Sequence, residues 1–140
     1  MKKIKYFKFS EFINSVTAKR QQIDNTPSFA VVDNLTRLAD YLDGIREKYG
    51  KPIFISSGYR CPLLNQAVGG VANSQHLKGL AADLICADME KLLSIIRETK
   101  GFDQVITEHN KGSKSYWIHV SVAPVFGKPR NQVIINLEKK

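Results

Sequence analysis

Residues 74–86 read SQHLKGLAADLIC, a stretch that places a histidine and an aspartate seven positions apart on either side of a glycine. The run LAADLIC is apolar except for Asp83, and its length is typical of a buried strand. The preceding segment, NQAVGGVANSQHLKG, is rich in glycine and asparagine and is predicted to be a loop. This loop would deliver His76 to the start of the strand, so His76 and Asp83 are candidate ligands of one metal ion.

The flanking segments predict helices before this strand and further strands after it. Helices bounded by typical capping and stop residues are expected after Ser10, at 32–49, at 62–68, and between Asp88 and Gly101. Strands are expected at 53–55 and in FDQVITE, SYWIHVSV and NQVIINLE. Because helices come first and do not alternate regularly with strands, we expect an α+β fold. Its N-terminal helices would pack on a mostly antiparallel sheet concentrated after residue 80.

The length and composition fit one globular domain. The chain has 140 residues, of which 43% are hydrophobic and 24% charged, so we expect one domain over 1–140 with a basic lead-in at 1–9. The formal charge of +8 would attract polyanions such as nucleic acid or an anionic cell-wall polymer. Much of the excess lies near the two ends, in Lys2, Lys3, Lys5, Lys8, Lys139 and Lys140. No groove-reading motif accompanies it, so nucleic acid is not the expected partner.

The N-terminal segment MKKIKYFKFSEFINS has lysines in every apolar stretch and therefore lacks the apolar run of a signal peptide. No apolar run approaches the roughly 20 residues of a membrane span. Cys61 and Cys86 are too few for a disulfide framework, which favours a reducing compartment, although one disulfide between them stays open. We expect cytoplasmic synthesis of a monomer that does not enter a membrane.

Strand parity supplies a third candidate ligand. In YWIHVSV, Trp117, His119 and Ser121 share one face, and the apolar residues between them share the other. The apolar face belongs in the core, so His119 faces the opposite side. If this strand pairs in register with LAADLIC, Asp83 and His119 lie about 5 Å apart across the ladder. The loop before Asp83 can then bring His76 to the same place.

Two imidazoles and one carboxylate, with a fourth position left for water, form the ligand set of a catalytic zinc site. Zinc in such a site lowers the pKa of the bound water and polarises a carbonyl group. Alternatively, His76 is an exposed loop residue and Asp83 pairs with a nearby cation. This spacing is far less specific than H-E-x-x-H, so the residues alone leave both interpretations open.

The segments SSGYRCPLLNQAVGGVANSQHLKGLAADL and WIHVSV resemble the zinc D-Ala-D-Ala carboxypeptidase family, part of the LAS group of peptidoglycan metallopeptidases. The resemblance extends from about Ile23 to Val122. It implies a LAS-like α+β fold, peptidoglycan peptides as partners, and one Zn²⁺ ion held by His76, Asp83 and His119.

The same resemblance implies two substrate-binding residues. Arg60 in SGYRCP matches the family arginine that receives the substrate carboxylate, a role that suits the planar guanidinium fork. Ser74 matches a position at which a hydroxyl helps to bind the substrate. The alternatives are a surface or structural role for Arg60 and simple loop capping by Ser74.

The general base does not follow from the family motif. Many relatives have an acid three residues before the last zinc histidine, where this chain has Tyr116. We favour Glu108, because its strand is expected to form a hairpin with SYWIHVSV. In addition, the pattern FDQ.I.E in residues 102–108 resembles the one found in a subgroup of the family. Gln104 shares the predicted strand face of Glu108 and could orient substrate or water, although an exposed sheet glutamine is equally compatible.

We therefore predict a zinc peptidase that hydrolyses peptide bonds in peptidoglycan stem peptides or cross-links, as a D-Ala-D-Ala carboxypeptidase or an endopeptidase. A zinc-bound water would be the nucleophile, Glu108 the base and Arg60 the carboxylate anchor. The missing acid at position 116 supports a second hypothesis, a non-catalytic zinc module of the same fold that binds the wall or a protein. The absent signal peptide would fit a phage-type lytic enzyme that reaches the wall after release.

Overall fold

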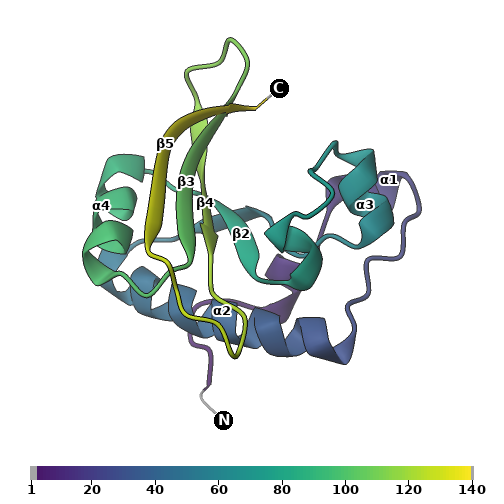
Figure 1. Ribbon diagram of the computed structural model, residues 1–140, viewed down its shortest axis with the longest axis horizontal. Coiled ribbons are helices and arrows are strands. Elements are labelled where there is room, and N and C mark those ends of the chain that lie inside the picture. Colours follow the sequence, from purple (N-terminus) through teal and green to yellow (C-terminus); the bar gives the residue numbers. More distant parts are fainter. Residues whose placement is uncertain (1–2, 140) are drawn as a thin grey trace.

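A five-stranded sheet forms the centre of the molecule, with its strands in the order β1-β2-β4-β3-β5 (Figure 1). The computed structural model of the chain describes residues 3–139. The strands are β1 (Phe54–Ser57), β2 (Ala81–Ile85), β3 (Gln104–Asn110), β4 (Tyr116–Ser121) and β5 (Gln132–Lys139). The neighbouring pairs are antiparallel except for β3 and β5, which are parallel. The prediction of an α+β fold with a mostly antiparallel sheet is confirmed.

Four α-helices and two 3-10 turns complete the described chain. They are η1 (Phe9–Phe12), α1 (Val16–Arg20), α2 (Phe29–Tyr49), α3 (Pro62–Ala67), η2 (Gln75–Lys78) and α4 (Met89–Thr99). None of these helices is long and apolar enough to cross a membrane. Cys61 and Cys86 are both free thiols, so the disulfide left open by the sequence does not form.

The longest helix, α2, begins three residues before its predicted start. The Ser28 side chain accepts a hydrogen bond from the Val31 amide and caps the helix, whereas Gly50, with φ of 81°, ends it. Phe29 is 95% exposed and lies outside the buried stripe of the helix. Periodicity therefore could not reveal the first turn, which depends on the cap.

A short helix does follow Ser10, but its predicted cap and start are wrong. Ser10 lies inside η1, and its carbonyl accepts hydrogen bonds from the amides that follow that turn. The helix begins instead after Ser15, whose side chain caps the Ala18 amide. In the basic lead-in, Phe7 is buried in the core; Lys2 and Lys140 lie outside the described residues.

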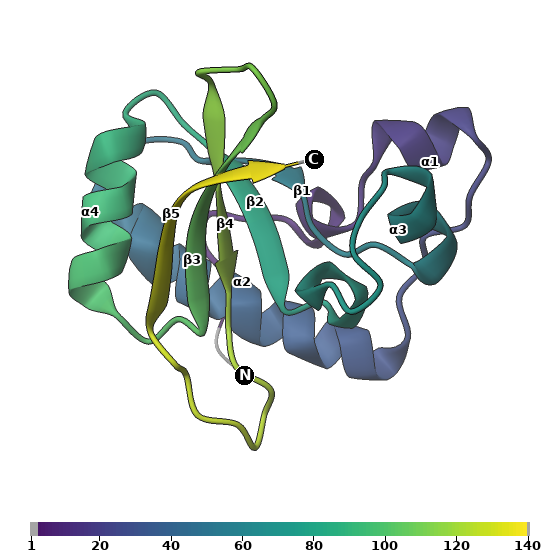
Figure 2. The same cartoon turned by 45° about the horizontal axis from the view of Figure 1, so that its top comes forward.

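The two faces of the sheet have different roles. One face of the sheet is covered by α2 and α4 (Figure 2). Leu38 and Leu42 of α2 belong to the same fully buried core cluster as Leu84, Ile118 and Val120 of the sheet. The other face carries the alternate residues of β2, β3 and β4. The packed face fixes the register of the strands, so it also fixes which polar side chains meet on the opposite face.

Candidate metal centre

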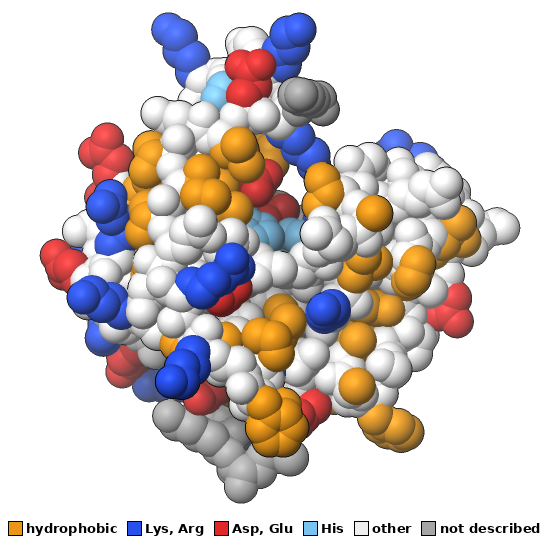
Figure 3. Space-filling view, in the orientation of Figure 1, with side chains coloured by type: hydrophobic (Ala, Val, Ile, Leu, Met, Phe, Trp, Pro, Cys, Tyr) orange, Lys and Arg blue, Asp and Glu red, His pale blue; other side chains and the backbone are white. Residues whose placement is uncertain are grey.

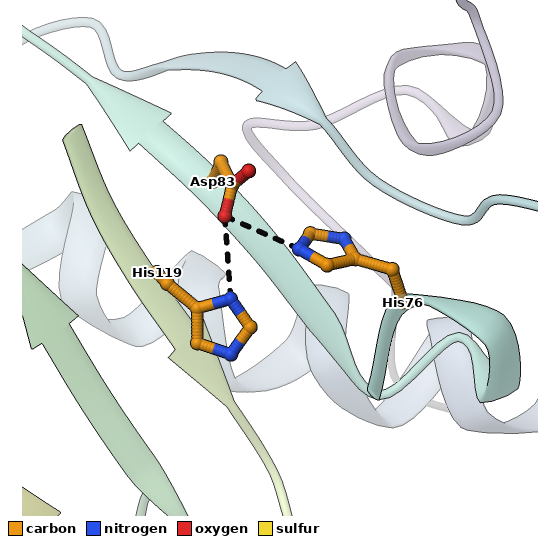
Figure 4. A group of neighbouring side chains, drawn as sticks. All are labelled: His76, Asp83 and His119. Carbon is orange, nitrogen blue, oxygen red and sulfur yellow. Dashed lines mark ion pairs between the residues drawn. The ribbon is translucent and has the colours of Figure 1, made fainter. Parts of the chain in front are cut away.

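Two histidines and one aspartate meet on the face of the sheet opposite α2 (Figure 4). Asp83 Oδ1 lies 3.2 Å from His76 Nε2 and 3.3 Å from His119 Nδ1. Asp83 on β2 is directly opposite His119 on β4, so the predicted register of these strands is confirmed. His76 is only 2% exposed, which rules out the alternative of an exposed loop histidine.

The short turn η2 brings His76 to the sheet. Ser74 caps this turn, since its Oγ accepts a hydrogen bond from the His76 amide at 3.2 Å. Gly79 ends the turn with φ of 73°, a conformation that favours glycine. A Cβ atom at Gly79 would also lie 2.9 Å from Cγ1 of Val31 on α2. The chain can therefore turn directly from His76 into β2, which carries Asp83.

Hydrogen bonds hold the outward nitrogens of both imidazoles. His76 Nδ1 lies 2.7 Å from the carbonyl oxygen of Gly58, which can only accept, so Nδ1 carries the proton and Nε2 offers a lone pair. His119 Nε2 lies 3.1 Å from Gln75 Oε1, while its Nδ1 faces Asp83. Each ring thus turns one nitrogen toward the same carboxylate oxygen.

The electrostatics of the cluster favour the protonation states that metal ligands need. Burial opposes the ionisation of Asp83, but the adjacent imidazoles of His76 and His119 outweigh it and hold the pKa of this carboxyl well below its usual range. Burial lowers the pKa of His76, against the opposing effect of Asp83. An ionised aspartate beside a neutral histidine is the state in which both bind a cation.

The donor atoms fit a zinc ion. Asp83 Oδ1 is buried without a hydrogen-bond partner, which is costly unless a cation neutralises it. When two donor atoms bind the same zinc ion in tetrahedral geometry, these two atoms lie roughly 3.3–3.4 Å from each other. The two contacts of Asp83 Oδ1, at 3.2 and 3.3 Å, match that separation. Two nitrogens and one oxygen are also the mixed ligand set of catalytic zinc sites.

A cavity of about 630 Å³ opens over these three residues, and we call it the central cavity. Figure 3 shows histidine side chains at the bottom of this hollow, between the sheet and the part of the chain that contains α1 and α3. The cavity brings together all the site residues predicted from the sequence, namely Arg60, Ser74, His76, Asp83, Gln104, Glu108 and His119.

The family model described as Peptidase M15 matches residues 5–121. The chain belongs to this family. The matched segment contains the three candidate ligands and the other predicted site residues, and it ends before β5. A comparison with curated proteins finds no match.

Glu108 lies on the cavity face of β3. It is opposite Trp117 in the ladder, and Ile106, two residues earlier, is opposite His119. Burial raises the pKa of Glu108, while the charges of His119, Lys139 and Arg60 oppose that shift. Tyr116, at the position of the acid in many relatives, packs against the core on the other face. Position 116 therefore does not face the metal centre, whereas position 108 does.

The remaining predicted site residues line the same cavity but have different surroundings. Arg60 is 9% exposed, its Nη2 lies 3.4 Å from Ser74 Oγ, and its Nε has no hydrogen-bond partner. Ser74 caps η2, which was the alternative role considered for it. Gln104 donates through its side chain to Gln132 Oε1 of β5 at 2.6 Å. Arg60 is thus the buried cation of the cavity, and Gln104 joins two strands at its rim.

The sequence interpretation missed three residues around the candidate metal centre. Gln75 contacts His119, Asp103 contacts Gln75, and Lys139 of β5 lines the cavity. Gln75 and Asp103 are sequence neighbours of predicted site residues, His76 and Gln104, and this adjacency was the available signal. No local pattern indicated that β5 would place Lys139 beside Glu108.

Proposed function

We propose that the chain is a zinc-dependent peptidase that hydrolyses peptide bonds in peptidoglycan stem peptides or cross-links. The observation that carries this proposal is the convergence in one cavity of an open ligand set, a carboxylate with a raised pKa and a buried guanidinium. Membership of a peptidase family supports the reaction class. The basic charge of the chain supports an anionic substrate such as the cell wall.

His76 Nε2, Asp83 Oδ1 and His119 Nδ1 are the atoms that would hold the zinc ion. The chemistry that zinc supplies when bound is Lewis-acid activation of water and of the peptide carbonyl. Three protein ligands leave a coordination position for the reacting groups, as a catalytic site requires.

Glu108 is the proposed general base. In its ionised form it accepts the proton of the attacking water and passes this proton to the leaving amine. Burial raises its pKa above the usual glutamate value, which makes the carboxylate a stronger base than an exposed one. Its place on the same sheet face as His119 supports this role, because the carboxylate and the candidate ligands border one cavity.

Arg60 is the proposed carboxylate anchor. Its guanidinium is buried and lines the central cavity, so its planar fork can bind a substrate carboxylate there. Ser74 Oγ lies beside it and can bind the neighbouring peptide group. Gln104, which lines the cavity, is the residue that we propose to orient the substrate.

A second cavity, of about 450 Å³, lies between β1 and the N-terminal helical segment. It shares Arg60, Asp83 and Lys139 with the central cavity, so space for a peptide extends to both sides of the metal centre. This extension supports cleavage within a cross-link, whereas the anchor at Arg60 supports removal of a terminal residue. The products of digestion distinguish these two forms of the reaction.

The test is mass spectrometry of monomeric and cross-linked muropeptides incubated with the zinc-loaded protein, with and without a chelator. We expect shorter peptides that disappear when the chelator is present. Glu108→Gln should lower the rate by roughly 10²–10⁴-fold, the contribution of a general base, and retain one zinc per chain. Glu98→Gln, an exposed glutamate on α4, is the matched control and should keep full activity.

The outcomes separate the hypotheses. Loss of a terminal alanine from monomers identifies a carboxypeptidase, and breakage of dimers identifies an endopeptidase. Stoichiometric zinc with intact muropeptides would overturn the proposal and favour the non-catalytic zinc module. An active Glu108→Gln variant would remove Glu108 from the role of base.

A further inference from the structure

A buried carboxylate outside the ligand set connects to the metal centre. Asp103, the residue before β3, is 6% exposed and forms two charged hydrogen bonds with Arg130, from Nε at 2.9 Å and from Nη2 at 2.7 Å. Its Oδ2 also accepts a hydrogen bond from Gln75 Nε2 at 3.0 Å. The other end of the same amide, Gln75 Oε1, lies 3.1 Å from His119 Nε2. The side chains form a continuous series from Arg130 to His119.

The chemistry of these groups allows only one direction for the hydrogen bonds. An ionised carboxylate can only accept, so Gln75 must present its NH₂ group to Asp103. The amide oxygen of Gln75 then faces His119 and can only accept from it. His119 Nε2 must therefore carry the ring proton, and Nδ1 keeps its lone pair toward Asp83. The hydrogen bonds from Arg130 keep the pKa of Asp103 below its usual value and so keep the carboxylate ionised.

The two histidines of the centre are fixed by different means. His76 donates to the backbone carbonyl of Gly58, which cannot reverse its polarity. His119 meets a side-chain amide, which can present either oxygen or nitrogen after a half turn. Without an acceptor-only group behind it, Gln75 could turn its NH₂ group to His119 and favour the tautomer with a proton on Nδ1. The second histidine thus needs a partner that orients the amide.

We propose that Asp103 and Gln75 are positioning residues that fix the metal-binding tautomer of His119. The proposal rests on the zinc site of the proposed function but not on its hydrolytic activity. The series joins η2, the residue before β3 and the segment before β5, and Arg130 lies beyond the residues that match the family model. A residue at position 130 thus acts on the ligand His119 through two side chains.

The test exchanges the polarity of the two positions. Asp103→Asn places an amide opposite an amide, so Gln75 can turn and His119 loses its fixed tautomer. Gln75→Glu places two carboxylates face to face. The double variant, Gln75→Glu with Asp103→Asn, restores a donor at position 103 and an acceptor at position 75. We expect each single variant to weaken zinc binding by roughly 10–100-fold, the usual effect of such outer partners, and the double variant to recover most of it.

Two measurements compare these variants, one of zinc affinity and one of the tautomer of His119. Competition with a chromogenic chelator gives the zinc dissociation constant, and ¹⁵N NMR of the imidazoles in zinc-free protein gives the tautomer of His119. Wild type and the double variant should show the proton on Nε2, whereas Asp103→Asn should show a mixture. Gln66→Glu on α3 makes the same exchange at an exposed glutamine and should change neither. The thermal midpoint of each zinc-free variant verifies that it is folded.

A purely structural role for Asp103 gives a different result. Asp103→Asn removes the ion pair with Arg130 in the single and the double variant alike, so loss of that pair alone predicts no rescue. An unchanged tautomer in Asp103→Asn, or a double variant no better than the singles, would overturn the proposal. Failure of wild type to cut muropeptides would overturn the proposed function and leave these measurements interpretable.

Discussion

The two walls of the central cavity are built differently. The wall formed by η2, β2 and β4 holds the candidate ligands, and there His76 is 2% and His119 7% exposed, with hydrogen-bond acceptors at their outward nitrogens. The wall formed by β3 and β5 carries Glu108, and within residues 3–139 its carboxylate has no hydrogen bond. One wall fixes its side chains by partners, whereas the other leaves its carboxylate free to exchange a proton.

The carboxylates of the two walls show what this difference achieves. Both face one side of the sheet, yet the imidazoles hold the pKa of Asp83 below its usual value, whereas burial raises the pKa of Glu108. A permanent anion suits a metal ligand, and a more basic carboxylate suits a proton acceptor. The environment of each carboxyl therefore assigns its role more clearly than its residue type does.

The largest expected effect comes from removing the ligand shared by both imidazoles. Asp83→Ala deletes the oxygen that faces His76 and His119, so we expect the protein to lose its zinc on desalting. Hydrolysis should fall further than in Glu108→Gln, which keeps the metal. Zinc content and muropeptide hydrolysis measured on the same samples test this order. A variant that retains stoichiometric zinc would show that Asp83 is not a ligand.

An intermediate effect is expected from disturbing the support of His76. A Cβ atom at Gly58 would collide with the backbone carbonyl of Phe12, so Gly58→Ala must shift the segment whose carbonyl accepts from His76 Nδ1. We expect a stability loss of about 1–3 kcal/mol, typical of overpacking, and zinc binding roughly 10–100-fold weaker. Chemical denaturation and chelator competition measure these two quantities.

Gly44 provides the matched control for that substitution. It is an exposed residue within α2, and a Cβ atom there would meet nothing within 4 Å. Gly44→Ala should stabilise the protein by about 0.5–1 kcal/mol, because alanine loses less backbone entropy in a helix. Its zinc affinity should equal that of wild type. Equal zinc affinity in the Gly58 variant would instead show that the Gly58 carbonyl does not position His76.

The ligand pairing could be predicted from sequence because it depends on strand parity. The apolar alternation in β2 and β4 fixes which side chains share a face, and the observed register then places Asp83 opposite His119. The burial of His76 on the turn η2 could not be predicted, because the sequence around it shows only that the segment contains turn-forming residues. The predicted cap at Ser10 is wrong because serine is an equally good cap at Ser15, and a local pattern does not distinguish the two positions.

The contribution of β5 could not be predicted from its own sequence. NQVIINLE has the composition of a strand, but the same alternation would fit a parallel or an antiparallel neighbour at either edge of the sheet. Its parallel pairing with β3 follows the path of residues 122–131, within which Arg130 forms an ion pair with Asp103. The sequence therefore placed Glu108 on the correct face of its strand, but it could not show that Lys139 of β5 would affect the pKa of Glu108.

The smallest expected effect tests this tuning. Lys139 lies at the end of β5, and its positive charge lowers the pKa of Glu108 against the dominant effect of burial. Lys139→Met removes the charge and preserves most of the side-chain length, so the pKa of Glu108 should rise further. The base acts in its ionised form, so activity is lost as the pH falls through this pKa. The acid limb of the pH-rate profile should therefore move to higher pH, with the plateau rate little changed.

Lys91 is the control for this substitution, because it also lies over an aromatic ring, Tyr49, as Lys139 lies over Trp117, but it is remote from the cavity. Lys91→Met should leave the acid limb in place when both variants are measured at equal zinc occupancy. An acid limb that stays fixed in Lys139→Met would mean that Glu108 does not control it. If the acid limb moves in Lys139→Met but not in Lys91→Met, the titrating base lies on the wall formed by β3 and β5. The ligands on the other wall keep their partners in both variants, so they cannot cause the difference.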